Sequence, residues 1–181
     1  MNNIRFKSKF RIPSSRLPNW DYSSSGWYYV TICTKNRICY FGDIFERKMQ
    51  LSETGRCAKK FWKEIPYHFK DVKLDEYNIL PDHIHGIIII NHNVETCHGM
   101  SLQNKFGKPK KNSLGIIINQ FKSAVTRWCY KNGFINFSWQ SRFYDHIVRD
   151  EQTLFKIRDY IRNNHLKWDD DEENPKNIRK R

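Results

Sequence analysis

The sequence of 181 residues lacks the cysteine pattern of disulfide-bonded secreted proteins and the long apolar segments of membrane proteins. Its five cysteines are an odd number without a Cys-x-x-Cys spacing, which fits neither a disulfide framework nor a zinc knuckle. No apolar run approaches the ~20 residues of a membrane-spanning helix, and the first residues lack the apolar centre of a signal peptide. These absences predict a soluble cytoplasmic protein with reduced thiols and no membrane partner.

Acidic residues are also scarce relative to basic ones. The 19 Asp and Glu residues oppose 32 Lys and Arg residues, which leaves a formal net charge of +13. Such an excess draws a small protein to polyanions, and nucleic acid is the first candidate. Aromatic residues make up 15% of the chain, and those outside the core can stack on unpaired bases. We therefore expect a nucleic-acid partner and a nucleoid-associated location.

The chain length suits one domain with appendages. Residues 1–24 form a basic arm interrupted by prolines, which either follows a phosphate backbone or is simply solvated. Residues 25–168 hold the folded domain, and residues 169–181 are a charged tail that we expect to be solvated and dispensable for folding.

Hydrophobic periodicity predicts the elements of the domain. An apolar residue every third or fourth position indicates helices, capped in two cases by a serine, whereas β-branched and aromatic runs indicate strands. The expected order is a strand at 27–34, a helix at 52–65, strands at 72–80 and 83–90, a helix at 113–132, a further strand within 134–148, and a helix at 150–164. This order matches an α+β fold, the ferredoxin-like split β-α-β sandwich, with an antiparallel central sheet, helices on one face and a further C-terminal helix that carries candidate catalytic residues.

Two histidines stand one residue apart at the start of the most apolar strand. Because alternate side chains of a strand share a face, His83 and His85 project together while Ile84 enters the core. Residues 72–80 and 83–90 are expected to pair as a hairpin, which places the histidines near its turn. The pair is either a metal site or a polar feature of the strand.

The last predicted helix carries a tyrosine and an amide one turn apart. Tyr160 and Asn164 lie ~40° from each other on a helical wheel, beside the apolar stripe. Taken alone, the two residues could simply pack at the edge of the helix's apolar face. Joined to two neutral imidazoles, an Asn carbonyl can hold Mg²⁺ or Mn²⁺ loosely, and a tyrosine supplies an oxygen nucleophile. The four residues together indicate phosphodiester transesterification.

Several separated motifs resemble one enzyme family. From about Trp27 to Trp168 the chain resembles the single-tyrosine His-hydrophobic-His (HUH) transposases, especially the REP-associated and insertion-sequence-200-like group. The motifs that carry the resemblance are Gly26-Trp27-Tyr28, Asn36-Arg37, Leu80-Pro81-Asp82, His83-Ile84-His85, Trp139-Gln140, Phe143-Tyr144-Asp145-His146 and Asp159-Tyr160-Ile161-Arg162-Asn163-Asn164. His165 departs from the family pattern, which often has proline after the paired asparagines, and this leaves the end of the helix open.

The resemblance implies a transposase-type single-stranded DNA endonuclease and strand transferase that acts on hairpin DNA. By position, Tyr160 would be the catalytic nucleophile that forms a 5′-phosphotyrosine link, and His83, His85 and Asn164 would be ligands of Mg²⁺ or Mn²⁺. Relatives act as monomers or as homodimers that exchange helices, so the resemblance leaves the oligomeric state open.

Three alternatives stand beside this hypothesis. Tyr144 is a rival nucleophile, but its neighbours Asp145 and His146 alternate in direction along an extended segment and no ligand follows one helical turn later. A domesticated module that binds structured nucleic acid without cutting it is a second alternative, and a relaxase or replication initiator is a third.

Basic residues in the arm, in the segment around 105–111 and on the later helices are candidate DNA contacts because Lys and Arg bind phosphate. They are Arg5, Lys7, Lys9, Arg11, Lys108, Lys110, Lys111, Lys122, Arg127 and Arg142. Cys97 and His98 are an unfavoured pair of zinc ligands, because they are neighbours in a loop that lacks a second pair.

Overall fold

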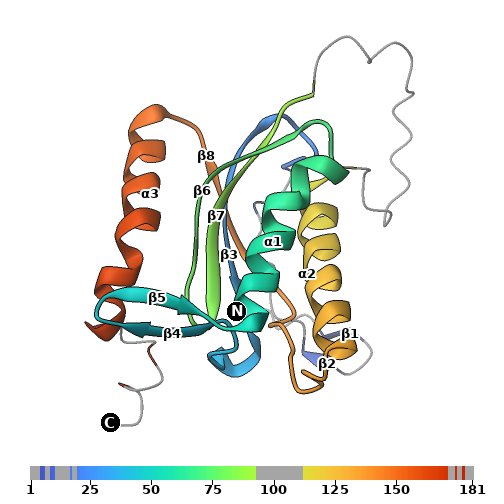
Figure 1. Cartoon of the computed structure of the whole chain (residues 1–181). Coiled ribbons are helices and arrows are strands. Elements are labelled where there is room, and N and C mark those ends of the chain that lie inside the picture. Colours follow the sequence, from blue (N-terminus) through green and yellow to red (C-terminus); the bar gives the residue numbers. More distant parts are fainter. Residues whose placement is uncertain are drawn as a thin grey trace.

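A four-stranded antiparallel sheet forms the centre of the molecule (Figure 1). The computed structural model describes residues 5–6, 9–10, 17, 20–92, 112–170, 174 and 177. The strand order is β6-β7-β3-β8, so the histidine strand β7 lies between two neighbours. The strands span Gly26–Cys33 (β3), Val72–Ile79 (β6), His83–Ile90 (β7) and Tyr144–Val148 (β8).

Helices cover both faces of this sheet (Figure 1). The helices α1 (Glu53–His68) and α2 (Leu114–Lys131) pack side by side on one face, and α3 (Glu151–Asn163) lies on the other. This arrangement confirms the predicted α+β fold, and the predicted hairpin of β6 with β7 is confirmed by their register, in which Ile79 pairs with Ile84.

Because side chains alternate between the two faces along each strand, each face of the sheet has its own hydrophobic core. Tyr28, Val30 and Ile32 of β3 are fully buried in the large cluster that contains α1 and α2 residues. Tyr29 of β3 and Ile87 of β7 belong instead to a smaller cluster under α3. Because α3 covers less of its face than two helices do, that face keeps room for polar side chains.

A glycine in the histidine strand allows α1 to approach the sheet closely. A Cβ atom at Gly86 would lie 2.3 Å from Cζ2 of the fully buried Trp62. No side chain fits at that distance, so glycine is required by packing at this position. Trp62 then seals the α1 face directly behind His85.

The helix boundaries follow their caps, with two differences from the sequence expectation. Ser52 accepts a hydrogen bond from the Gly55 backbone N–H at 3.0 Å, and Asp150 caps α3 by accepting from Thr153 at 2.7 Å. Ser113 precedes α2 but makes no side-chain capping bond. Helix α1 also continues past Pro66 to His68, three residues beyond the predicted end.

A short hairpin was absent from the sequence expectation. It consists of β4 (Gly42–Phe45) and β5 (Lys48–Leu51), joined through Glu46 and Arg47, which both adopt positive φ. Its Ile44 packs with Leu80 and Trp168. Only one position of these two strands, Ile44, is buried, so the segment lacks the strong apolar alternation that would have predicted it.

The end of α3 resolves the question raised by His165. The chain passes from α3 directly into a 3-10 helix, η3 (Asn164–Asp170), which carries Trp168 into the core beside the hairpin. In the predicted solvated tail, Asn174 is an exception: it is 1% exposed, and its side-chain amide donates to the Trp168 carbonyl.

The last strand of the sheet and a small hairpin near the N-terminus complete the described elements. The strand expected within residues 134–148 is β8, which begins at Tyr144, while residues 134–140 form a turn and a single bridge between Trp139 and Thr34. Two short strands, β1 (Arg5–Phe6) and β2 (Lys9–Phe10), pair antiparallel within the arm. None of the described helices is long and apolar enough to span a membrane.

Candidate active site

The two histidine side chains meet on the α3 face of the central strand. His83 is 2% exposed and His85 is 4% exposed, and their Nε2 atoms lie 2.9 Å apart. That distance fits a single N–H···N hydrogen bond between neutral rings. The prediction that both side chains project to one face is confirmed, and their Nε2 atoms converge on a common point.

A carboxylate orients His83 from its other nitrogen. The Nδ1–H of His83 donates to Oδ1 of the fully buried Asp82 at 2.6 Å, and Oδ2 of Asp82 forms an ion pair with Nε of Arg37 at 2.9 Å. Arg37 reaches this position from a turn in which it and Asn36 have positive φ. Since the proton of His83 is committed to Nδ1, its Nε2 lone pair faces His85 and the site.

Two hydroxyl groups hold the other nitrogen of His85. Tyr29 Oη lies 2.8 Å and Thr31 Oγ1 lies 3.0 Å from Nδ1 of His85. Hydroxyls both donate and accept, so they accommodate either neutral tautomer, including the one that frees Nε2 as a lone pair. Burial, together with the nearby His83 and Arg37, lowers the pKa of His85 to about 2. The imidazole is therefore neutral, which is the metal-binding form.

The predicted tyrosine lies against this pair. The ring of Tyr160, on α3, is 5.2 Å from the ring of His85 in an edge-on arrangement, and 45% of the residue is exposed. Trp168, two turns of chain later, packs its ring 6.0 Å from His83. The segment from Tyr160 to Trp168 therefore contacts His85 at its first residue and His83 at its last.

Asn164 stands midway along that segment. It is the C-cap of α3 and still has helical dihedral angles, so it lies one turn from Tyr160 as predicted. Asn164 is 6% exposed, and its Oδ1 has no hydrogen-bond partner in the part of the chain that the structure describes. A buried amide oxygen without a protein partner is free to bind a water, a ligand or an ion.

Polar contacts fix α3 on its own sheet. The Asn78 amide donates to the carbonyl of Ile161 at 3.1 Å, and Arg158 pairs with Asp75 through two hydrogen bonds. Arg162 pairs in the same way with Glu76. Because β6 supplies all three partners, these contacts hold α3 beside β7 and place Tyr160 against His85.

The donor set suits a hard or borderline cation. Among the described residues, no three His, Cys, Asp or Glu side chains are arranged so that together they could hold a metal ion. The available donors are instead two imidazole nitrogens and the unpartnered amide oxygen of Asn164. Such a neutral set fits loose binding of Mg²⁺ or Mn²⁺ with positions left for phosphate oxygens.

Tyr144 also lies on the α3 face, beside Tyr29. It is 52% exposed on the edge strand β8, opposite Thr31, and its ring is 6.3 Å from the ring of Tyr29. The expected alternation is confirmed, since Asp145 is buried on the other side while His146 is exposed. What distinguishes Tyr160 from Tyr144 as a candidate nucleophile is its ring contact with His85.

The predicted DNA contacts divide into three groups. Lys122 donates to the Gln140 carbonyl at 2.6 Å and lies over the Trp139 ring, and burial lowers its pKa, so it supports the Trp139–Gln140 loop. Arg127 and Arg142 are exposed. The others, together with Cys97 and His98, have side chains outside the described residues; they are Arg5, Lys7, Lys9, Arg11, Lys108, Lys110 and Lys111.

Sequence reasoning gave no role to the four residues that hold the histidines. Asp82 and Arg37 appeared only as parts of family motifs, and Tyr29 and Thr31 only as strand residues. The signal for Asp82 was an acid directly before the first histidine. The signal for Thr31 was alternation, because it pairs with His85 across the sheet.

Comparison with known proteins finds a relative in sequence and a solved structure with the same fold. No family model matches the chain. An uncharacterized protein of Haemophilus influenzae is 40% identical over 163 residues, which cover 88% of this chain and 91% of that protein. The chain belongs to the same family as that protein.

A solved structure shares the fold of this family. A REP-associated tyrosine transposase bound to a REP hairpin superimposes with a TM-score of 0.55 and 18% sequence identity, over 79% of this chain and 68% of the other. The resemblance predicted from the sequence is thus confirmed at the level of the fold.

Proposed function

We propose that this protein is a transposase-type single-stranded DNA endonuclease and strand transferase that acts on hairpin DNA. The observation that carries the proposal is the contact of the Tyr160 ring with the ring of His85, 5.2 Å away, with the buried and unpartnered Asn164 oxygen one turn further along the chain. The solved neighbour is a tyrosine transposase bound to a hairpin, which supports hairpin DNA as the substrate class. The net charge of +13 supports the same polyanionic substrate.

The ligand set of the site would be His83, His85 and Asn164, with Mg²⁺ or Mn²⁺ as the cation. A bound cation would polarise the scissile phosphate and stabilise the charge that develops on it. The chain itself prepares this set: Asp82 directs the His83 lone pair, and with a cation bound, the hydroxyls of Tyr29 and Thr31 would accept a hydrogen bond from the Nδ1–H of His85.

Tyr160 would carry out the covalent step. Its hydroxyl oxygen attacks the scissile phosphorus and forms a phosphotyrosine bond, while the bond from phosphorus to the 3′ oxygen breaks and that oxygen takes up a proton. In the second step the 3′-hydroxyl of another strand attacks the same phosphorus and Tyr160 regains its proton. Both steps exchange one phosphoester for another, so no energy source is needed.

The exposure of Tyr160 suits this role. A phenol titrates near ~10 in water, so attack at neutral pH requires charge stabilisation next to the oxygen. Tyr160 is partly open to solvent on one side, which admits a DNA strand, and contacts His85 on the other. Because Tyr160 contacts His85 of its own chain, we propose that a monomer suffices for cleavage.

A covalent adduct tests the proposal. The protein is incubated with a hairpin oligonucleotide that carries a single-stranded flank, with Mn²⁺ or Mg²⁺, and a denaturant-resistant shift is sought on a gel. We expect the adduct with the native protein and with Tyr144→Phe, and its loss in Tyr160→Phe. Tyr144→Phe is a matched control because that tyrosine lies on the same face with similar exposure.

Two outcomes would contradict the proposal. Loss of the adduct in Tyr144→Phe with retention in Tyr160→Phe would assign the nucleophile to β8. Tight, salt-sensitive binding of many hairpins without any adduct would favour a silent binding module, the alternative raised by the sequence.

A further inference from the structure

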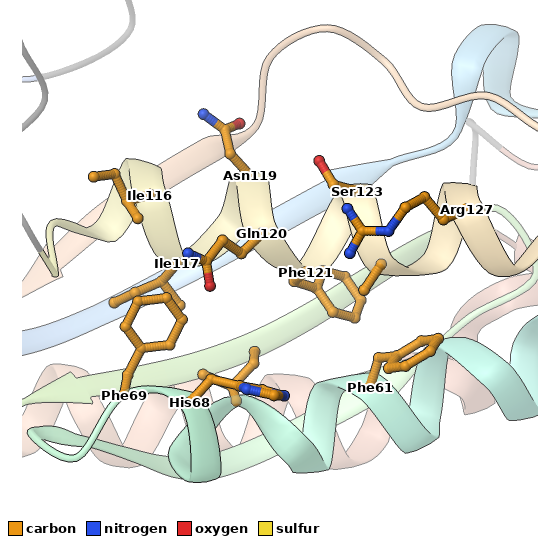
Figure 2. A pocket seen from close by; sticks show the side chains of 12 residues that line it. Phe61, His68, Phe69, Ile116, Ile117, Asn119, Gln120, Phe121, Ser123 and Arg127 are labelled. Atoms are coloured by element: carbon orange, nitrogen blue, oxygen red, sulfur yellow. The ribbon is translucent and has the colours of Figure 1, made fainter.

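A groove of about 480 Å³ runs between α1 and α2, on the sheet face opposite Tyr160 (Figure 2). Figure 2 shows side chains from both helices around it, with Phe61 and His68 on α1 and Gln120 and Phe121 on α2 turned toward the space between them. Its size is that of pockets that enclose small organic groups. No part of the proposed catalytic set contributes to it.

The lining combines an apolar floor with a polar rim. Phe69, Ile117 and Phe121 are buried and form the floor, and Phe61 is half-buried beside them. Gln120 and Ser123 are exposed at the rim. A flat heteroaromatic ring fits this combination, because its faces contact aromatic side chains while its edge meets amide and hydroxyl groups.

The charge of the groove is positive and unneutralised. Arg127 lies exposed at the rim without an ion-pair partner among the described residues, and no acidic residue lines the groove. A second hollow of about 370 Å³ continues from Phe61 and adds Arg56 and Lys60 against the single acid Glu53. A phosphorylated ligand is therefore favoured over an uncharged one.

We propose that the α1–α2 groove binds one unpaired nucleotide of a nucleic acid, with its base on the apolar floor and a phosphate at Arg127. Stacking on aromatic side chains is the general means by which proteins hold unpaired bases, and a neighbouring guanidinium binds the backbone. This site extends beyond the proposed strand transfer, because it lies behind the sheet and needs neither Tyr160 nor a cation.

Filling the groove provides the first test. Two DNA probes are compared by fluorescence titration of the full chain without metal: a blunt duplex, and the same duplex with one bulged 2-aminopurine, whose fluorescence falls on stacking. We expect a preference of about tenfold for the bulged probe, the contribution of one stacked base, together with quenching. Ser123→Phe should remove both, and Ser123→Ala should keep both.

Removing the charge provides the second test. Arg127→Gln should weaken binding of the bulged probe by about tenfold and lower the slope of log affinity against log salt by about 1. Lys131→Gln is the matched control, since Lys131 is an exposed cation on the same helix and is absent from the groove. It should change the affinity less than about twofold.

Three results would overturn the proposal: equal losses in the two charge variants, a preference that survives Ser123→Phe, or a native dimer that Ser123→Phe converts to a monomer without change in the preference. The last would make the groove an interface between copies of the chain. A missing tyrosine adduct would contradict the proposed function and leave these binding results unaffected.

Discussion

The two faces of one sheet use the same strands for different purposes. On the α1–α2 face, Ile84 and Ile88 of β7 pack in a continuous apolar core. On the α3 face, His83 and His85 of the same strand meet polar partners and leave their Nε2 atoms toward one point. Alternation therefore lets a single strand supply stability on one side and chemistry on the other.

This comparison explains why buried histidines are tolerated in so apolar a strand. Burying a polar group without a partner costs several kcal/mol, roughly 2–7. Asp82, Tyr29 and Thr31 provide those partners, while the core behind them needs none. Substitutions on the α3 face should therefore change chemistry, and substitutions on the α1–α2 face should change stability.

The largest expected effect is on the α3 face. His83→Ala should reduce adduct formation by about a thousandfold, because it removes a ligand and with it several kcal/mol of charge stabilisation. DNA binding, measured by anisotropy, should fall little, since phosphate contacts supply most of the affinity. Ile88→Val, on the other side of the same strand, should cost about 0.5–1.5 kcal/mol of stability and leave the adduct rate unchanged. A similar loss of adduct in both variants would break the comparison.

A second prediction concerns the close approach of α1. Gly86→Ala should destabilise the fold by about 3 kcal/mol, because its Cβ would overlap the Trp62 ring. The measurement is the free energy of unfolding from denaturant titration. Trp62→Phe, introduced into the Gly86→Ala protein, should restore part of this loss by making room, which a double-mutant cycle would show as coupling. Additive effects would mean that Gly86 has another role.

The smallest expected effect is that of a residue acting through a histidine. Asp82→Asn should weaken Mn²⁺ binding by about 10- to 100-fold, because the acceptor that directs the His83 lone pair loses its charge. Isothermal titration calorimetry measures the affinity directly. Asp71→Asn is the control, since Asp71 contacts His92 at 3.3 Å in an exposed pair away from the site. Equal Mn²⁺ affinities of the two variants would show that Asp82 is structural only.

Much of the fold could be predicted because its signals are local. The spacing of Leu114, Ile117 and Phe121 defines α2, and the caps at Ser52 and Asp150 define where α1 and α3 begin. The β4–β5 hairpin was not predicted, because it has no such local signal. Its strands are short, and it is held by a distant partner, Trp168, that no local pattern announces.

The sequence by itself determined that His83 and His85 share a face and that Tyr160 and Asn164 lie one turn apart, because both relations follow from the geometry of a strand and of a helix. Only the tertiary structure decided that Tyr160 contacts His85, that Asp82 and Arg37 orient His83, and that the Oδ1 of Asn164 is buried without a partner among the described residues. Distances between residues some 75 positions apart are set by how α3 docks on β6, and that docking depends on ion pairs and packing from both elements at once.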